Sequence, residues 1–555
     1  MRLAPLAMLL VRGCAALARS APRLQRATRL CATEAEAAAK PPKQKQQQKQ
    51  KQQQKPATEV AASDQITSAS SDFSQWYLDV IKAADMVDQS PVKGCMVIKP
   101  WGMAIWDLLR TELDDRIKAS GAQNAYFPLL IPQSFLSKEA EHVDGFAKEC
   151  AVVTHHRLRA DGKGGVEPDP AALLEEPLII RPTSETIIWY MFGKWINSHR
   201  DLPLKINQWA NVVRWEMRTR PFLRSAEFLW QEGHTAHANS EEAVECARGM
   251  LDTYASVCQD MLAMPVVKGV KSASERFAGA DETFTIEALM PNGWALQSGT
   301  SHFLGQNFAK AFDVQFQTAE AGRELVWATS WGVSTRLIGA LVMTHSDDAG
   351  LVLPPRIAPT QVVIVPIIPK KNDLEAAKLV NDAVDRVAAS LKPLRVKVDD
   401  RDNMRPGAKY FEWERKGVPL RIEVGPRDAA AGTCVVAQRT GGEKQVVSFD
   451  DIKAHADAAL ESMQKSLFDK ALARQQAYTF SVESYADMKR QLEDGPAGLF
   501  LVPWKADVAN EEAIKEETKA TIRCYPLDAQ GDLEGKKCFY SGDAATHVAI
   551  FARAF

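Results

Sequence analysis

The sequence lacks a long hydrophobic run and a strong excess of charge of either sign. No stretch of about 18 or more consecutive apolar residues occurs, so no membrane-spanning helix is expected. The 555 residues carry 68 Lys and Arg against 70 Asp and Glu, a formal net charge of −2. A chain with so little net charge has no overall basic field to attract nucleic acid, so any such binding must use local basic patches.

Cysteine pairs and two common nucleotide-binding motifs are also missing. The nine cysteines are odd in number and form no C-x-x-C pair, which argues against a disulfide framework and for a reducing compartment. Neither G-x-x-x-x-G-K-[ST] nor G-x-G-x-x-G occurs, which disfavours a P-loop or dinucleotide-binding enzyme. The hydrophobic content of 46% suffices for globular cores, and 555 residues predict about three domains.

The N-terminal segment has six arginines and no acidic residue in its first 33 positions. This composition, rich also in Ala and Leu, is typical of an organellar transit peptide and leaves mitochondrion, plastid or both open. A secretory signal fits less well because Arg12 interrupts the apolar stretch, and a merely disordered basic tail is the other alternative. Residues 40–55 are almost wholly Lys, Gln and Pro, which predicts a disordered spacer. We therefore expect residues 1–63 to precede the folded protein.

An arginine-rich hairpin is predicted at residues 211–234. Arg214 lies in an apolar run and is expected on a strand, with Glu216 on the same face two residues later. A polar turn then leads through Arg224 into a second apolar run that contains Phe228. Two antiparallel strands joined by a cationic loop would direct several guanidinium groups at one place, and Arg holds phosphate by paired hydrogen bonds. A plain hairpin with a solvated charged turn is the alternative.

Phosphate-type chemistry recurs further along the chain. The segment QSGTSHFLGQNF supplies Gln297, Thr300 and His302. The segment SWGVSTRLIG places Ser334 and Arg336 at the start of an apolar, helix-like run. This recurrence favours a phosphate-binding enzyme over an isolated charged hairpin.

With these motifs in view, the chain resembles a known family. R-x-E, a loop and R-x-x-x-F resemble motif 2 of the class II aminoacyl-tRNA synthetases, and the segment around Arg336 resembles motif 3. Together with RPTSE, WQEGH and GTSH, in this order and spacing, they resemble prolyl-tRNA synthetase of the archaeal and eukaryotic type, from about residue 72 to Phe555. An amphipathic helix from Pro100, followed by a strand at residues 124–132, resembles motif 1, which forms the dimer interface in that family. The resemblance therefore implies a homodimer.

The resemblance implies ATP-dependent ligation of L-proline to tRNA(Pro) through a prolyl-adenylate, for protein synthesis in an organelle. It assigns catalysis to Arg214 and Arg336, stacks adenine between Phe228 and Arg336, and places Mg²⁺ on the phosphates. The implied proline site comprises Thr183, Glu185, Arg214, Trp230, Glu232, His234 and His302. The implied ATP site comprises Arg214, Glu216, Arg224, Phe228, Gln297, Thr300, Ser334 and Arg336.

Two of these residues have structural alternatives. Glu232 could be an ion-pair partner that only supports the fold. Glu185 follows Ser184 and precedes an apolar helix-like run, so it could be a helix-capping acid, a role compatible with substrate binding.

The implied fold combines α/β and α+β domains. It has a class II antiparallel-sheet catalytic domain at residues 64–355, an α/β anticodon-binding domain at 356–463 and a small α+β domain at 464–555. Alternating strand and helix patterns after residue 359 independently predict the α/β domain. Its candidate anticodon contacts are Arg401, Lys409 and Glu412. Too few residues separate Phe228 from Gln297 to hold the editing domain of bacterial-type relatives.

The last domain departs from the family pattern of a structural zinc on four cysteines. Lys505 follows the Pro-Trp pair where such relatives have Cys, and of the second pair only Cys538 remains. Cys524 lies in an apolar strand and is expected in the core. Structural zinc takes four N or S ligands, so we expect no structural zinc and a domain held by apolar packing. The chain ends at Phe555, where relatives often have Tyr, and an approach of its carboxylate to the site stays open.

Three rival functions remain at this stage. A threonine-specific class II synthetase would hold a catalytic zinc on Cys and His ligands, and no such triad surrounds motif 2. A non-catalytic synthetase-like binding protein would typically have lost the phosphate arginines, which this chain keeps. A structural or scaffold role for the C-terminal part alone is left open.

Overall fold

The structure is a computed structural model that describes residues 65–140, 149–368, 373–531 and 533–555. The predicted transit segment and spacer, residues 1–63, lie outside the described residues. Within the described ranges, no helix is both long and apolar enough to cross a membrane.

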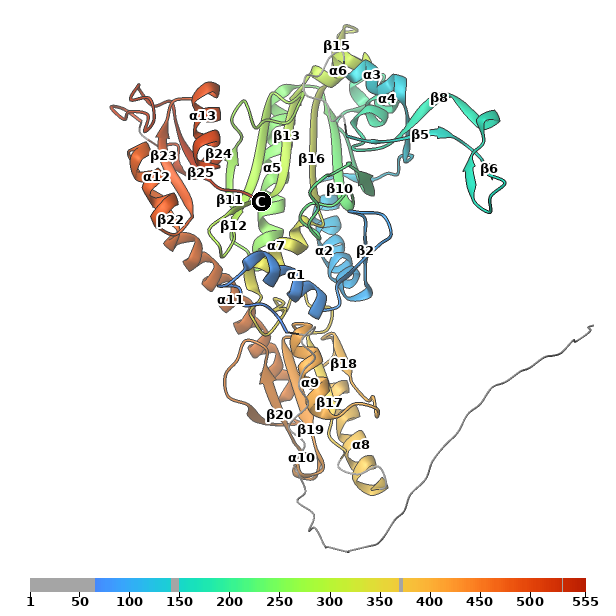
Figure 1. The fold of residues 1–555 in the computed structure, drawn as a ribbon, viewed down its shortest axis with the longest axis vertical. Helices are drawn as coiled ribbons and strands as arrows, with labels where there is room; N and C mark the ends of the chain where they lie inside the picture. Colours follow the sequence, from blue (N-terminus) through green and yellow to red (C-terminus); the bar gives the residue numbers. More distant parts are fainter. Residues whose placement is uncertain (1–64, 141–148, 369–372, 532) are drawn as a thin grey trace, which may run out of the picture. The chain divides into compact units, whose positions relative to one another are not determined.

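An eleven-stranded sheet is the main structural element (Figure 1). Seven strands of this sheet come from residues 123–334, in the order β3, β9, β10, β16, β13, β12, β11. They are antiparallel except for the β3–β9 pair. The strand bounds are β3 (Gln123–Asn124), β9 (Leu204–Val213), β10 (Glu227–His237), β16 (Trp327–Ser334), β13 (Ala295–Gly305), β12 (Glu282–Leu289) and β11 (Val267–Val270).

Four helices pack with this sheet around one large hydrophobic core: α1 (Phe73–Ala83), α2 (Pro100–Ala119), α5 (Ser240–Asp260) and α7 (Arg336–His345). Helix α5 contacts β12, β13 and β16, and α2 packs against α5 (Figure 1). The helix predicted from Pro100 is confirmed, because its apolar residues Ile105, Leu109, Leu113 and Ile117 are all buried. It ends before Gly121, whose φ of +89° lies in the left-handed region that glycine adopts readily.

The single strand predicted at residues 124–132 is wrong. The structure divides it into β3 and β4 (Leu130–Pro132), which belong to different sheets. The Ala125 N–H still donates to Asn207 of β9, but the Phe127 N–H donates to the side-chain oxygen of Gln208. The chain therefore leaves the large sheet after Ala125, a change of partner that a local apolar pattern does not encode.

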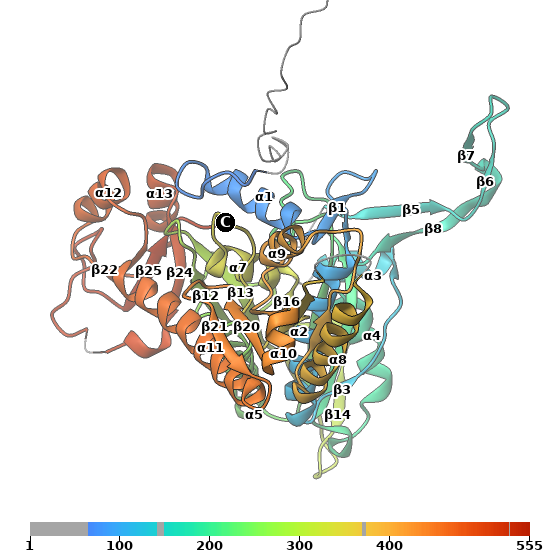
Figure 2. The same cartoon turned by 90° about the horizontal axis from the view of Figure 1, so that it is seen from below.

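A long β-arm branches from this region and was not anticipated from the sequence. Strand β8 (Leu173–Ile180) pairs with both β4 and β5 (Ala151–His155), and the small hairpin of β6 (Leu158–Ala160) and β7 (Val166–Pro168) lies at its end (Figures 1 and 2). The remaining short elements are β1 (Val87–Gln89), β2 (Met96–Ile98), α3 (Gln133–Ala140), α4 (Glu185–Trp195), α6 (Asn307–Phe312), β14 (Gln315–Gln317) and β15 (Arg323–Leu325).

The α/β domain predicted after residue 359 is present. Its five-stranded sheet has the order β18-β17-β19-β20-β21, parallel among the first three strands and antiparallel beyond them. The strands are β17 (Val362–Pro366), β18 (Val396–Val398), β19 (Leu420–Val424), β20 (Thr433–Gln438) and β21 (Gln445–Ser448). Its helices are α8 (Leu374–Ser390), α9 (Pro406–Arg415) and α10 (Pro426–Ala431).

The boundary predicted between residues 463 and 464 falls inside one continuous helix, α11 (Ile452–Ala477), so no linker separates the last two domains. The last domain then contains β22 (Thr479–Ser481), α12 (Tyr485–Asp494), β23 (Leu499–Trp504), α13 (Val508–Thr518), β24 (Thr521–Pro526) and β25 (His547–Ala552). Its strands extend the large sheet, because β24 pairs antiparallel with β11. Gly269 of β11 permits this seam, since a Cβ there would collide with Cys524.

The expected apolar packing of the last domain is also found. Phe500, Ile522 and Phe551 are fully buried in its main core, and Leu499 and Ile550 lie in a second cluster against β13. Cys524 is buried, as its place in an apolar strand predicted.

Candidate active site

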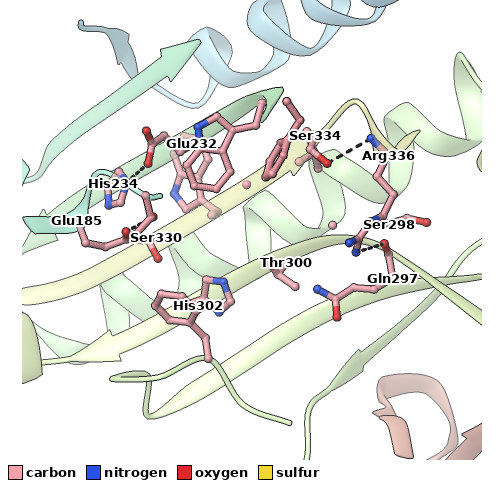
Figure 3. A pocket seen from close by; sticks show the side chains of 18 of the residues that line it. Glu185, Glu232, His234, Gln297, Ser298, Thr300, His302, Ser330, Ser334 and Arg336 are labelled. Atoms are coloured by element: carbon pink, nitrogen blue, oxygen red, sulfur yellow. Dashed lines mark hydrogen bonds and ion pairs between the residues drawn. The ribbon is translucent and has the colours of Figure 1, made fainter. Parts of the chain in front are cut away.

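A cavity of about 290 Å³ opens between β10, β13 and β16 and the loops that follow β8 and β9 (Figure 3). It brings together nearly all of the predicted proline and ATP residues: Thr183, Glu185, Arg214, Phe228, Trp230, Glu232, His234, Gln297, Thr300, His302, Ser334 and Arg336. The two exceptions, Glu216 and Arg224, line an adjacent groove that shares Arg214 with the cavity. The sequence motifs thus converge on one place from distant parts of the chain.

The loop that carries Arg214 differs from its prediction. Strand β9 ends at Val213, so Arg214 and Glu216 lie beyond the strand and do not share a strand face. The Arg214 N–H donates to Ala226 O at 2.8 Å, and its Nε donates to Pro182 O at 3.0 Å. These backbone contacts fix the guanidinium, whose Cζ lies 5.6 Å from the Phe228 ring centroid.

One end of the cavity is rich in carboxylates and hydrogen-bonding groups. The Thr183 hydroxyl donates to the carboxylate of Glu185, the first residue of α4. The Ser184 side chain caps nothing in that helix; it donates to Glu232 at 2.5 Å instead. The capping-box alternative for Glu185 is therefore wrong, because the serine hydroxyl is engaged elsewhere.

Glu232 is buried and held by several donors. The Gln208 Nε2 donates to it at 2.8 Å, and His234 Nε2 lies 3.2 Å from its other oxygen. Burial raises the pKa of Glu232, but its hydrogen bonds and the charge of His234 lower that pKa overall. These contacts support the structural alternative for Glu232, although its side chain also lines the cavity.

The two histidines of this end differ in electrostatics. Burial disfavours a charge on His234, but the hydrogen bond to Glu232 and the charge of Glu185 raise its pKa overall. Burial and the neighbouring His234 lower the pKa of His302 to about 3, so the imidazole of His302 is neutral near pH 7. Its Nδ1 lies 3.0 Å from the Thr283 hydroxyl.

The opposite end of the cavity is cationic and is centred on Arg336 (Figure 3). Its guanidinium bonds only to carbonyl oxygens among the described contacts, at 3.1 Å to Leu223 O and 3.5 Å to Gln297 O. Burial, with the charges of Arg224 and Arg214, lowers the pKa of Arg336 to about 10. A half-buried cation surrounded by like charges favours an anionic ligand, since phosphate oxygens would supply the missing negative charge.

The turn within motif 2, at residues 221–223, supports Arg336 from behind. The Tyr77 hydroxyl of α1 donates to Pro221 O at 2.7 Å, and the Leu223 N–H donates to the same oxygen at 2.7 Å. Phe222 between them has a φ of +59°, an uncommon conformation for a non-glycine residue. Helix α1 thus buttresses the turn whose Leu223 carbonyl receives Arg336.

Several cavity residues were missed in the sequence. Phe277 lies against the His302 ring at 4.5 Å between centroids, and Glu275 precedes it in the same loop. Trp331 packs across Gly233, where any Cβ would collide with its ring. For Gly233 the sequence did give a signal, because it lies inside the quoted segment WQEGH. The other additions to the lining, Ser298, Gly299, Ser330, Gly332 and Val333, lie inside the segments QSGTSHFLGQNF and SWGVSTRLIG, which pointed to the site although these residues were not assigned to it.

Four buried polar atoms of cavity-lining residues have no hydrogen-bond partner within the described part of the chain. They are Trp230 Nε1, His234 Nδ1, Ser330 Oγ and Trp331 Nε1. Buried polar groups are nearly always paired in folded proteins, so unpaired ones at a cavity wall indicate a polar ligand or water.

The three candidate anticodon residues form one ionic cluster around Asp399 of the α/β domain. Arg401 makes two short bonds to Asp399 and an ion pair with Glu412 at 2.9 Å. Lys409 is buried and donates to Asp399 O at 2.8 Å. A buried, bonded ammonium is poorly placed to contact a base, whereas Arg401 and Glu412 are partly exposed.

The positions at which the resemblance implied zinc ligands make other contacts. Lys505 forms an ion pair with Asp543 at 2.8 Å, and the Cys538 N–H donates to Asp543 O at 2.7 Å. Burial raises the pKa of the Cys538 thiol, but backbone N–H groups around its sulfur lower it overall. Among the described residues, no group of three or more His, Cys, Asp or Glu could hold a metal ion.

The C-terminal Phe555 lies beside β13 and not in the cavity lining. Its N–H donates to Ala295 O at 3.2 Å, and its ring lies 5.2 Å from that of Trp294. The Arg220 guanidinium of the motif 2 turn lies 6.0 Å from the same ring. The chain end therefore contacts the turn next to the site.

Comparisons with known proteins agree with this geometry. Three family models match: tRNA synthetase class II core domain (G, H, P, S and T) over residues 171–345, anticodon binding domain over 361–456, and prolyl-tRNA synthetase, C-terminal, over 485–555. The proline–tRNA ligase of Bacteroides fragilis is 58% identical over 495 residues, which cover 88% of this chain and 99% of that protein. That of Porphyromonas gingivalis is 56% identical over 493 residues, with the same coverage.

A solved structure is also similar. The prolyl-tRNA synthetase from Cryptosporidium parvum, complexed with halofuginone and AMPPNP, has a TM-score of 0.81 and 41% identity, covering 89% of this chain and 100% of that chain. With the motifs gathered in one cavity and relatives of this identity over nearly their whole length, the chain belongs to the prolyl-tRNA synthetases, class II aminoacyl-tRNA synthetases that act as proline–tRNA ligases.

Proposed function

We propose that the cavity forms prolyl-adenylate, with proline at its carboxylate-rich end and ATP at its cationic end. The observation that carries this assignment is the polarity of the cavity: Glu185 and Glu232 lie at one end and Arg336 lies at the other (Figure 3). Arg214 lines the same cavity and is close enough to interact electrostatically with the glutamates and with Arg336. A zwitterionic amino acid and a polyanionic nucleotide need this arrangement if their reacting groups are to meet at Arg214.

In this proposal the reaction needs no general base. The proline carboxylate is already a nucleophile; it attacks the α-phosphorus of ATP, the new oxygen–phosphorus bond forms, and the bond to the leaving pyrophosphate breaks. Catalysis then reduces to alignment and to stabilisation of the charge on the pentacoordinate phosphorus. Arg214 suits this role because its Nε is fixed by Pro182 O while the rest of its guanidinium faces the cavity.

The ATP end would hold the nucleotide by stacking and by charge. Phe228 and Arg336 both line the cavity and would offer a ring face and a guanidinium plane to adenine. Arg224, exposed in the neighbouring groove, would contact the outer phosphates, and the partly exposed Glu216 beside it would contact the adenine or the ribose. No group of three or more His, Cys, Asp or Glu within the described ranges could hold a metal ion, and Mg²⁺ would be held mainly by phosphate oxygens, whose charge it would neutralise.

The proline end would recognise the secondary ammonium and the ring separately. Glu185, with the Thr183 hydroxyl beside it, supplies acceptors for the two ammonium N–H donors. Trp230, His234 and His302 line the adjoining wall, and the unpaired His234 Nδ1 faces the same region. A charge-assisted hydrogen bond of this kind contributes about 1.5–3 kcal/mol.

This division of the cavity can be tested by kinetics. We expect Arg336→Lys to raise the KM for ATP in proline-dependent pyrophosphate–ATP exchange much more than the KM for proline. We expect Thr183→Val to raise the KM for proline much more than the KM for ATP. If both variants change the same KM, the two substrates are not divided along the cavity as proposed.

We also propose that the enzyme is a homodimer through its motif 1 region. Tyr126 is 75% exposed and Leu130 is 38% exposed, both between β3 and the arm, which leaves large apolar side chains in solvent at this place. Sedimentation of the purified protein at micromolar concentration should give twice the chain mass, and Tyr126→Arg should shift it toward the monomer. A wild-type monomer with full aminoacylation activity would refute the proposal.

For tRNA, we propose that the α/β domain reads the anticodon through the partly exposed Arg401 and Glu412, with Lys409 as their internal support. Arg401→Ala should raise the KM for tRNA(Pro) in aminoacylation and leave proline-dependent exchange unchanged. An unchanged KM for tRNA would exclude Arg401 from the interface.

Finally, we propose that residues 1–63 direct import into an organelle and take no part in catalysis. Six arginines without an acid before residue 34 support this, followed by the Lys/Gln spacer. A truncated enzyme starting near Ser63 should aminoacylate at the full rate. A fluorescent protein fused behind residues 1–60 that stays in the cytosol would overturn the targeting proposal.

A further inference from the structure

A buried ionic triad joins the last domain to the wall of the cavity. Glu287 of β12 is 1% exposed, and its carboxylate receives Lys271 Nζ at 2.8 Å on one oxygen. Arg523 of β24 donates to the other oxygen through Nε at 3.1 Å and Nη2 at 3.0 Å. Both cations are themselves buried, so the last domain contributes a charged side chain to the interior of the catalytic domain.

The triad lies at two irregularities of the large sheet. Glu287 stands directly opposite Gln297 in the β12–β13 register, and the pairing shifts there so that Ser298 is the extra residue. On the other side, the β24–β25 pairing shifts at Arg523. Bulges of this kind redirect a side chain and are common beside active sites. Each end of the Arg523–Glu287 contact is therefore at a place where the backbone departs from regular pairing.

The bulge on β13 matters because it shapes the ATP end of the cavity. Gln297 and Ser298 both line that cavity, and Gln297 O accepts the Nη1 of Arg336 at 3.5 Å (Figure 3). The Thr285 hydroxyl lies 3.0 Å from Glu287 and 3.4 Å from Gly299 O, so it ties the triad to the same stretch of β13. A fixed Glu287 thus holds the strand that presents Gln297 and receives Arg336.

We propose that Arg523 is a positioning residue for adenylate formation: through Glu287 it holds the β13 bulge that sets Gln297 and Arg336 for ATP. The last domain then serves catalysis directly, although none of its residues lines the cavity. This inference rests on the proposed assignment of ATP to the cationic end. Disrupting the triad should change the KM for ATP and not the KM for proline. The residues that would bind proline, Thr183, Glu185 and His234, contact none of the three charged groups.

A purely electrostatic role makes the opposite prediction for one variant. Arg523 carries a positive charge and contributes to the lowered pKa of Arg336, whereas Glu287 raises that pKa. If the triad acted only through its field, removing the Glu287 charge would strengthen the attraction for phosphates and lower the KM for ATP. If it acts by position, removing either partner releases the bulge and raises that KM.

The test compares Arg523→Met, Arg523→Lys, Glu287→Gln and the double variant Arg523→Met/Glu287→Gln in proline-dependent pyrophosphate–ATP exchange, using the full-length enzyme. We expect Arg523→Met and Glu287→Gln each to raise the KM for ATP by about 2- to 30-fold, with little change in the KM for proline. Arg523→Lys should restore part of the loss because it keeps a donor and a charge. The double variant should be no worse than the more severe single variant, because both act through one contact.

Two controls keep the outcome decisive. Lys505→Ala breaks an exposed ion pair in the same domain and should leave both KM values unchanged. Arg336→Lys tests the ATP assignment itself: if it leaves the KM for ATP unchanged, the proposed function fails and not only the coupling. With a working Arg336 control, the positioning role is overturned if Glu287→Gln lowers the KM for ATP, or if Arg523→Met changes only the unfolding temperature or both KM values equally.

Discussion

The Nε of Arg336 donates to the carbonyl oxygen of Leu223 across 3.1 Å, which joins the start of α7 to the turn within motif 2. Motifs 2 and 3 are thus held to each other by a hydrogen bond before any substrate is present. Tyr77 completes this support from α1, since its hydroxyl bonds Pro221 O two residues before Leu223. The turn is consequently a shared structural base for the cationic end of the cavity.

The first prediction concerns this support. Tyr77→Phe removes one buried hydrogen bond and no packing volume, so we expect the free energy of unfolding to fall by about 0.5–1.5 kcal/mol. The KM for ATP should rise a few-fold, because the Leu223 carbonyl loses part of its restraint. Denaturant titration and exchange kinetics measure the two effects. Tyr540→Phe, in the last domain, is the matched control and should change neither; equal effects of the two variants would contradict the role of Tyr77.

The second prediction concerns proline recognition. Glu185→Gln keeps the shape of the side chain but removes the charge that would pair with the secondary ammonium. We expect the KM for proline to rise by about 10- to 150-fold, corresponding to about 1.5–3 kcal/mol, with ATP binding almost unchanged. The measurement is exchange kinetics at varied proline and varied ATP. An unchanged KM for proline together with a collapse of ATP binding would place Glu185 in the ATP half.

The third prediction concerns pH. His345 Nε2 donates to Leu262 O at 2.8 Å, and burial, with the charges of Arg474 and Lys470, lowers the pKa of His345 to about 4. An unfolded histidine titrates near pH 6.5, so between about pH 6.5 and 4 only the unfolded state takes up this proton. Stability from this group is therefore fully present above pH 6.5 and declines as the pH falls, by up to about 1.4 kcal/mol per pH unit.

Chemical denaturation of the wild type and His345→Gln at several pH values checks this expectation. The variant should lose less stability on acidification than the wild type. Replacement of the exposed His199 by Gln should leave the wild-type pH dependence intact. Parallel pH curves for wild type and His345→Gln would show that His345 does not contribute.

The sequence predicted those parts of the fold that depend on local residue patterns, and it missed those that depend on contacts between residues far apart in the chain. The helix from Pro100 and the alternating strands and helices after residue 359 follow from local patterns, and both were predicted. The strand at residues 124–132 failed because Gln208, far along the chain, captures the Phe127 N–H. The site residues were identified from sequence motifs, and none of them was identified from a predicted contact.

The parts of the site that were missed are those set by distant partners. Arg214 was assigned to a strand, but β9 stops one residue earlier: the Arg214 N–H still donates to Ala226 O, whereas the Ala226 N–H donates to Gly94 O and not back to Arg214. The triad of Glu287, Lys271 and Arg523 depends on β24 joining β11, a pairing between residues more than 250 positions apart. No local pattern carries such information.

The fourth prediction concerns zinc. Because Lys505 and Asp543 occupy the region where relatives place ligands, and Cys538 is the one remaining motif cysteine, the last domain should fold without metal. Elemental analysis of the purified enzyme should find far less than one zinc per chain, and a chelator should leave the unfolding temperature unchanged. About one tightly bound zinc per chain, lost together with the fold on chelation, would contradict this expectation.

The most direct test of the whole account is the activity of Arg214→Ala in proline-dependent pyrophosphate–ATP exchange. Arg214 lines the cavity and interacts electrostatically both with Glu185 and Glu232 and with Arg336, so it is the residue proposed to act where proline and ATP react. Removing a charge that stabilises the transition state costs on the order of 10²-fold or more in rate. We predict that loss in a protein whose sedimentation and unfolding match the wild type; near-normal exchange in this variant would contradict the proposed site.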